Sequence, residues 1–153
     1  MAIHNVAVIG LGVGRGHIAE GYAAHPDKFR VEAICDLNPE RLTEIGDEFG
    51  IPVRTTSFDE ILRMREIEVI DICTPPTVHI GQILAALEAG KQVICEKPLV
   101  GSLADLDRVV QAEAAAPGRV MPIFQYRYGD GLQQARRIVE AGIAGKPYLA
   151  TVE

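Results

Sequence analysis

A glycine-rich turn follows the first apolar run of the chain, in the segment GLGVGRG at residues 10–16. Glycines between a buried strand and a helix let the backbone turn sharply and approach a phosphate, which the amino end of the helix attracts. We expect Gly10 to allow the turn, and Gly12 and Val13 to face the pyrophosphate of a dinucleotide. The position directly after a strand makes this interpretation stronger than glycines alone would.

The match to the dinucleotide-binding pattern G-x-G-x-x-G is imperfect, because Arg15 stands where the third glycine should be. That glycine normally allows close packing of the helix on the strand. Gly14 or Gly16 is therefore predicted to take this role in a loop shortened by one residue. Arg15 is a candidate phosphate ligand, with a solvated surface residue as the alternative.

An acidic residue ends the second apolar run. Asp36 lies 24 residues after Gly12, close to the spacing of the acid that binds the adenosine ribose in dinucleotide-binding folds. A carboxylate there accepts both ribose hydroxyls of NAD and repels the 2′-phosphate of NADP, so NAD is the expected cofactor and NADP the less favoured one. The alternative is an acid that interacts with a helix dipole. Arg41, one helical turn further, could contact adenine or a phosphate, or lie free on the surface.

Two further polar segments follow the fourth and fifth apolar runs. Thr74 and Pro75 begin an extended turn, and His79 falls in the first turn of the next helix, where we expect it to face the same crevice. A structural histidine is the alternative. Glu96 and Lys97 end the fifth run, and a lysine at that edge can move a proton to or from a substrate hydroxyl or can be a plain surface residue.

Composition is that of an ordinary globular protein of 153 residues, with 48% hydrophobic and 24% charged residues. The net charge of −6 without a basic run argues against nucleic acid or an anionic membrane as a partner. Neither a membrane-spanning run nor a signal peptide is recognisable, so a cytoplasmic location is expected. The three cysteines lie near strand ends as predicted core residues, and their spacing suggests no metal site.

Apolar runs alternate with amphipathic stretches along the chain. Strands are predicted at residues 6–9, 31–35, 53–55, 69–73, 93–95 and 120–126. Helices are predicted at residues 16–24, from residue 38 or 39, at 57–64, from 77 to 90, from 102, and at 131–141, with Ser57, Thr77 and Ser102 as caps. This alternation predicts a doubly wound, parallel α/β sheet of strand order 3-2-1-4-5-6, with ligands at the carboxyl ends of the strands.

The end of the sequence does not fit this sheet. Residues 148–153 look like a strand with no partner downstream, so we expect residues 1–127 to form the dinucleotide-binding domain. Residues 128–153 are then the crossover helix and first strand of a missing substrate domain.

Taken together, the sequence resembles the Gfo/Idh/MocA family of oxidoreductases (glucose–fructose oxidoreductase and inositol dehydrogenase). The resemblance rests on the glycine loop with His17, Asp36, the Thr-Pro-Pro segment with His79, AGK at 89–91 and Glu-Lys-Pro at 96–98, followed by QYRY at 125–128 and GIAGKP at 142–147. It covers essentially the whole chain, and the Glu-Lys-Pro motif is its most specific part.

The resemblance implies a Rossmann domain followed by a second α/β domain, and hydride transfer between nicotinamide and a hydroxyl-bearing carbon of a small sugar or cyclitol. It implies that Lys97 is the catalytic or substrate-orienting lysine, that Glu96 and His79 line the nicotinamide–ribose region, and that Arg127 lies at the rear of the substrate pocket. The Lys97–Pro98 peptide is often cis in the family. The full-length protein is expected to be a homo-oligomer.

The family's catalytic Asp-x-x-x-His pair would lie beyond residue 153. We therefore expect this chain to bind cofactor but to be nearly inactive alone. Two other functions remain open from the sequence. One is an NAD-dependent glycoside hydrolase, which recycles its cofactor. The other is a nucleotide-sensing module without catalysis.

Overall fold

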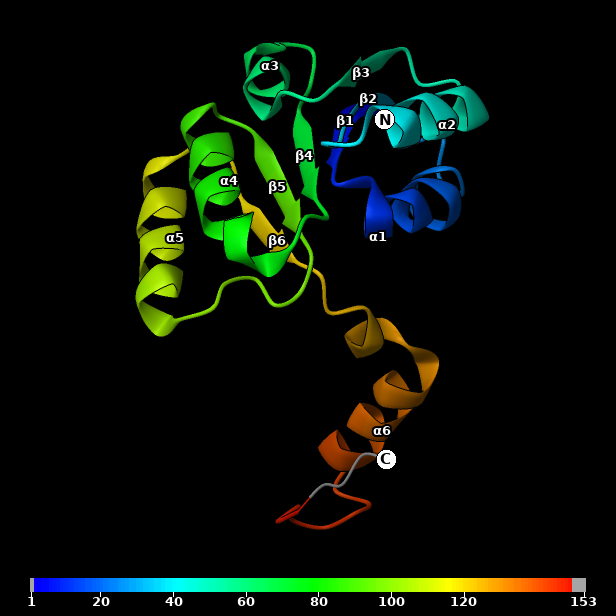
Figure 1. Cartoon of the computed structure of the whole chain (residues 1–153). Helices are drawn as coiled ribbons and strands as arrows, with labels where there is room; N and C mark the ends of the chain where they lie inside the picture. The colour runs from blue at the N-terminus through cyan, green and yellow to red at the C-terminus, as the bar shows by residue number, and fades with distance from the viewer. Residues whose placement is uncertain (1, 150–153) are drawn as a thin grey trace. The chain divides into compact units, whose positions relative to one another are not determined.

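The computed structural model describes residues 2–149 and contains one parallel sheet (Figure 1). Its strand order is β3-β2-β1-β4-β5-β6, as predicted. The strands are β1 (His4–Ile9), β2 (Phe29–Cys35), β3 (Val53–Thr55), β4 (Val69–Ile72), β5 (Gln92–Cys95) and β6 (Val120–Pro122). The chain order of the strands reverses between β1 and β4, which is where ligands bind in sheets of this kind.

Helices cover both faces of the sheet; Figure 1 shows α4 and α5 on one side, with α1 and α2 on the other. They are α1 (Leu11–Gly16), the π-helical η1 (His17–Tyr22), α2 (Pro39–Phe49), α3 (Phe58–Arg63), α4 (Pro76–Glu88), α5 (Leu103–Ala115), the 3-10 helix η2 (Gln125–Tyr128) and α6 (Asp130–Glu140).

The buried core has two parts, one on each face. In β1, Val6 and Val8 pack with the α1, η1 and α2 side, whereas Ala7 and Ile9 pack with the α3, α4 and α5 side. Successive residues of a strand point to opposite faces, so a strand buried on both faces has a continuous apolar sequence. The sheet therefore holds the carboxyl ends of its strands on a rigid, two-sided core.

Local signals at helix starts are mostly confirmed. The side chain of Asn38 accepts hydrogen bonds from the backbone of Glu40 and Arg41, and Ser57 and Ser102 cap α3 and α5 in the same way. The prediction for Thr77 is wrong. Helix α4 already begins at Pro76 after an extended Pro75, without a side-chain cap, because the fixed φ of proline suits the first helical turn.

Two element boundaries differ from the sequence prediction by more than two residues. The first helix begins at Leu11 rather than at residue 16, and it continues into the π-helical η1. Strand β6 ends at Pro122, and residues 125–128 form η2 instead of continuing the strand. Of the strand expected at residues 148–153, Tyr148 and Leu149 have no regular structure, and the rest lies outside the described residues.

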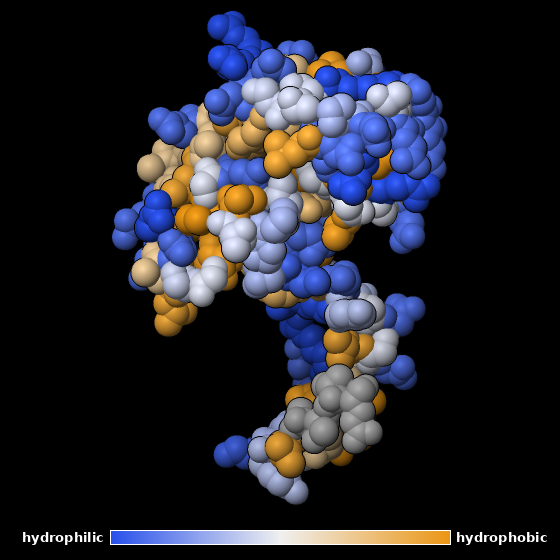
Figure 2. Space-filling model, viewed as in Figure 1, coloured by the Kyte–Doolittle hydropathy of each residue, from blue (hydrophilic) through white to orange (hydrophobic). Residues whose placement is uncertain are grey.

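The chain divides into two compact units, residues 1–123 and 124–153. The first contains the sheet, and the second contains η2 and α6. Leu132, Ile138 and Val139 leave an apolar face of α6 exposed, and Figure 2 shows apolar side chains at the surface of this unit. No helix in the described part of the chain is long and apolar enough to cross a membrane.

Candidate cofactor site

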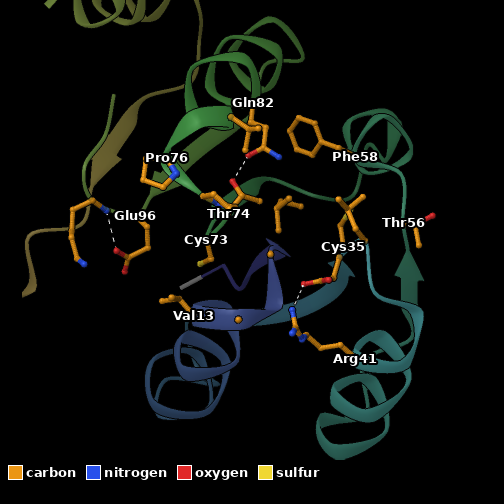
Figure 3. A pocket seen from close by; sticks show the side chains of 18 residues that line it. Val13, Cys35, Arg41, Thr56, Phe58, Cys73, Thr74, Pro76, Gln82 and Glu96 are labelled. Atoms are coloured by element: carbon orange, nitrogen blue, oxygen red, sulfur yellow. Dashed lines mark hydrogen bonds and ion pairs between the residues drawn. The ribbon is translucent and has the colours of Figure 1, made fainter. Parts of the chain in front are cut away.

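A cavity of about 690 Å³ lies at the carboxyl ends of β1, β2, β4 and β5. This volume is within the range of small-molecule and cofactor sites. Most of its wall is apolar, and charged side chains stand at its two ends (Figure 3). The lining residues are Ile9, Gly10, Gly12, Val13, Cys35, Asp36, Leu37, Arg41, Thr56, Phe58, Cys73, Thr74, Pro75, Pro76, Val78, Gln82, Glu96 and Lys97.

The glycine loop forms the floor of this cavity. Gly10 has a φ of 86°, and a Cβ there would lie 2.9 Å from the backbone of Cys73 and Thr74. A Cβ on Gly14 would lie 2.6 Å from the Cγ1 of Val8, so Gly14 provides the close helix–strand packing. Gly12 has nothing within 4 Å of its Cβ position and lines the cavity, which leaves room for a ligand to approach the backbone.

Asp36 is held at the adjacent end of β2. Its Oδ2 accepts a hydrogen bond from the Leu11 N–H at 2.7 Å, and its Oδ1 accepts one from the Asn38 N–H at 2.9 Å. Burial opposes ionisation, but these two hydrogen bonds and the nearby Arg41 guanidinium keep the pKa of Asp36 below its usual value. The group is therefore an oriented carboxylate beside the glycine loop.

Beyond Asp36, the cavity contains the candidate Arg41 and three residues that sequence reasoning missed. Arg41 lies 3.3 Å from Asp36 Oδ2, and Leu37, Thr56 and Phe58 line the same end. Figure 3 shows Arg41, Thr56 and Phe58 on this side. They follow β2 and β3, so their position after strands at the ligand-binding edge was an available signal.

The turn after β4 forms another wall. Thr74 donates a hydrogen bond to the side-chain oxygen of Gln82 at 2.6 Å, and Pro75 and Pro76 line the cavity. The predicted orientation of His79 toward the crevice is wrong. Its side chain is fully buried behind the turn, where its ring nitrogens lie 2.8 Å from the Thr74 carbonyl and 3.0 Å from the Pro98 carbonyl.

Glu96 stands at the opposite end of the cavity from Phe58 (Figure 3), and the next residue, Lys97, also lines the cavity. Glu96 is buried, Lys97 is exposed, and the Lys97–Pro98 peptide is cis. One Glu96 oxygen accepts a hydrogen bond from the Lys97 N–H at 3.0 Å, and the other lies 3.2 Å from His17 Nε2.

A buried polar cluster behind Glu96 was not predicted. His17 Nδ1 lies 2.9 Å from Asp71 Oδ2, which also accepts a hydrogen bond from the Tyr22 hydroxyl at 2.8 Å. The Cys73 sulfur lies 3.2 Å from His17 Nδ1. The side-chain atoms of His17, Asp71 and Cys73 that could bind a metal ion lie within 4.8 Å of one another. Hydrogen bonds already connect these three groups.

A further candidate residue of the first unit, Arg15, is not brought to this cavity. Arg15 pairs with Glu48 on α2 and lies over the ring of Phe49, so the solvated alternative describes it better than a phosphate contact does. Arg127 belongs to the second unit, and its role in a substrate pocket stays a prediction.

Comparison with known proteins agrees with this geometry. The family model for the Gfo/Idh/MocA oxidoreductase family with an NAD-binding Rossmann fold matches residues 4–124. The chain belongs to this family. An inositol 2-dehydrogenase of Salmonella typhimurium is 30% identical over 145 residues, and a levoglucosan dehydrogenase of Pseudarthrobacter phenanthrenivorans is 33% identical over 150.

The match covers 93% of this chain but only 43% and 38% of these two relatives, so the chain spans less than half of their length. Among solved structures, levoglucosan dehydrogenase in complex with NADH and levoglucosan aligns with a TM-score of 0.86 at 31% identity, covering 95% of this chain and 41% of that one. The WlbA dehydrogenase of Bordetella pertussis in complex with NADH and UDP-GlcNAcA aligns with a TM-score of 0.89 at 28% identity, covering 96% and 45%.

Proposed function

We propose that this chain is the cofactor-binding part of an NAD-dependent dehydrogenase that oxidises a hydroxyl-bearing carbon of a sugar or cyclitol. The observation that carries the proposal is the orientation of the Asp36 carboxylate. It accepts a hydrogen bond from the Leu11 N–H at the start of α1 and lies beside the glycine loop. The relatives named above, which are inositol and levoglucosan dehydrogenases, support the substrate class.

The residues of the cavity fit a dinucleotide. Each oxygen of Asp36 accepts one backbone hydrogen bond and keeps acceptor capacity for the two hydroxyls of a ribose. Gly10 supplies no side-chain cap for α1, and Asp36 accepts only the Leu11 N–H, so the next N–H groups of the first turn are available to a pyrophosphate over Gly12. The apolar surface of Leu37 and Phe58 suits an adenine ring.

The other end of the cavity is suited to the reaction. Bound NAD supplies a hydride acceptor at nicotinamide C4. In this proposal Lys97, whose side chain is exposed at the cavity edge, orients the substrate oxygen by donating a hydrogen bond to it while the carbonyl forms, and the hydroxyl proton passes to a base of the substrate-binding domain proposed below. Glu96 carries a negative charge near this end, which favours a cationic ring there.

We further propose that residues 124–153 begin a substrate-binding domain, to which Arg127 contributes. The exposed apolar face of α6 and the greater length of the relatives support this. A homo-oligomer of the full-length protein stays a prediction. Steady oxidation of a cyclitol by these 153 residues alone would contradict this division of roles.

The cofactor assignment is tested by titrating NADH and NADPH into the wild-type chain and into Asp36→Asn. Wild type should prefer NADH, and the variant should lose about tenfold or more in NADH affinity, because charged acceptors make the stronger hydrogen bonds. Its NADPH affinity should change less, since the repulsion of the 2′-phosphate is removed. Asp107→Ala, an exposed acid on α5, is the control. Tighter NADPH binding by wild type would overturn the role of Asp36.

A further inference from the structure

His17 connects two carboxylates that belong to different strands. It lies at the start of η1, directly after the glycine loop, with Nδ1 2.9 Å from Asp71 in β4 and Nε2 3.2 Å from Glu96 after β5. Asp71 is completely buried, and Glu96 is nearly so. Short π-helical segments are often found at functional sites, and here the segment carries both His17 and Tyr22 to Asp71.

The partners of the ring define its charge. Carboxylate oxygens only accept hydrogen bonds, and a neutral imidazole can donate from only one nitrogen. A ring that bonds to Asp71 and Glu96 at once must therefore carry protons on both nitrogens. The hydrogen bond to Asp71 raises the pKa of His17, and burial of the ring lowers it. The negative charge of Asp71 and the contact with Glu96 raise it further, so the net shift of the pKa is upward.

The other groups around the ring are consistent with this state. Tyr22 and Cys73 both donate to Asp71, and burial beside that carboxylate raises the pKa of each above its usual value. Both groups therefore act as donors to Asp71, which leaves His17 as the group of the cluster that can carry a positive charge.

We propose that His17 is a positioning residue: as an imidazolium between Asp71 and Glu96, it fixes the Glu96 carboxylate and, through it, the Lys97 backbone at the wall of the cavity. The inference rests on the proposed NAD-dependent function. Both Glu96 oxygens are committed, one to His17 Nε2 and one to the Lys97 N–H, so the carboxylate cannot turn without breaking one of these bonds. A change at His17 thus reaches the Lys97 end, while Asp36 lies at the other end of the cavity.

The binding test compares NADH with ADP, which has the same adenosine and pyrophosphate groups but lacks the nicotinamide and its ribose. In His17→Gln, whose amide cannot carry charge, NADH affinity should fall about tenfold or more, as for loss of a charge-assisted hydrogen bond. ADP affinity should stay within about threefold, because ADP lacks the part of the cofactor that is expected at the Glu96 end. The matched control is His4→Gln, since His4 pairs with Glu68 on the exposed surface.

An equal loss for both ligands would show a merely structural role and would overturn the proposal, as would no loss for either. A wild-type chain that binds neither ligand would instead contradict the proposed function.

An NMR titration of the histidine rings decides the positioning claim independently of ligand binding and of the folding of His17→Gln. The wild-type His17 ring should lose its proton at higher pH than in Glu96→Gln, where one carboxylate partner is neutral. Equal midpoints in the two proteins would overturn the proposal.

Discussion

At the scale of single residues, Gly14 shows how little space the glycine loop leaves. Its missing side chain lets α1 lie against Val8 of β1, and this packing keeps the loop under the cavity. Gly16 lies only two residues further along, and nothing lies within 4 Å of its Cβ position. Gly14, and not Gly16, therefore takes the packing role of the third glycine in the irregular motif.

Gly14→Ala should lower the free energy of unfolding by about 1–3 kcal/mol, because the new methyl group overpacks against Val8. Gly16→Ala is the matched control, since it adds the same group in open space at a helical φ of −64°. It should be neutral or stabilise the fold by up to about 1 kcal/mol. Urea unfolding of both variants measures the difference, and equal effects would contradict the packing role of Gly14.

Some residue roles could be predicted and others could not. Gly10, Gly12 and Asp36 follow strands at the ligand-binding edge, so spacing alone placed them at the cavity. The contacts of His17 depend on three segments that are far apart in sequence, and no local pattern reports them. Arg15 was ambiguous because its partner Glu48 lies on another helix.

At the scale of elements, His79 joins two of the cavity's loops. From α4 it contacts the Thr74 carbonyl in the turn after β4 and the Pro98 carbonyl in the loop after β5. Both loops supply cavity wall, through Thr74 and Lys97. His79, which was expected to face the cavity, therefore has a structural role behind it, where its buried ring bridges the two loops.

His79→Ala should lower the free energy of unfolding by about 2–5 kcal/mol, because it leaves a buried cavity and removes the hydrogen-bond donor from at least one backbone carbonyl. The control Glu88→Ala, on the exposed surface of the same helix, should stay within about 0.5 kcal/mol. Thermal and urea unfolding provide the measurement. A near-neutral effect of His79→Ala would show that the two loops do not need this bridge.

Features that depend on neighbouring residues were predicted more accurately than features that depend on residues far apart in the sequence. The caps at Asn38, Ser57 and Ser102 use hydrogen bonds within two or three residues, so they could be read from sequence. The π-helical turn at His17–Tyr22 depends on bonds to Asp71 in another strand, and the sequence carried no signal for it. The end of β6 at Pro122 did have a local signal, because proline has no N–H to continue the strand ladder.

At the scale of the whole molecule, the sheet and its cores lie in the first unit. Every residue of the two buried clusters lies between positions 6 and 120. The strand order could be predicted because right-handed crossovers and short connections leave few alternatives. The assignment of residues 124–153 depends on what they contact in the full-length protein.

A chain shortened to residues 1–123 should fold and keep its NADH affinity within about twofold, because no core residue is removed. Its thermal midpoint should remain within about 5 °C of that of the 153-residue chain. Scanning calorimetry and NADH titration test both statements. A large loss of stability would mean that the second unit supports the first.

The three thiols of the chain suggest a practical use. Burial and the nearby Asp36 and Glu60 charges raise the pKa of Cys35 to about 11, and burial with Asp71 and Glu96 raises that of Cys95 to about 12. The pKa of Cys73 is raised as well. Thiolate, the form that attacks maleimides and iodoacetamides, is therefore scarce at neutral pH. A cysteine introduced on the outer surface would become the preferred attachment point for a fluorophore, with the native three left in place.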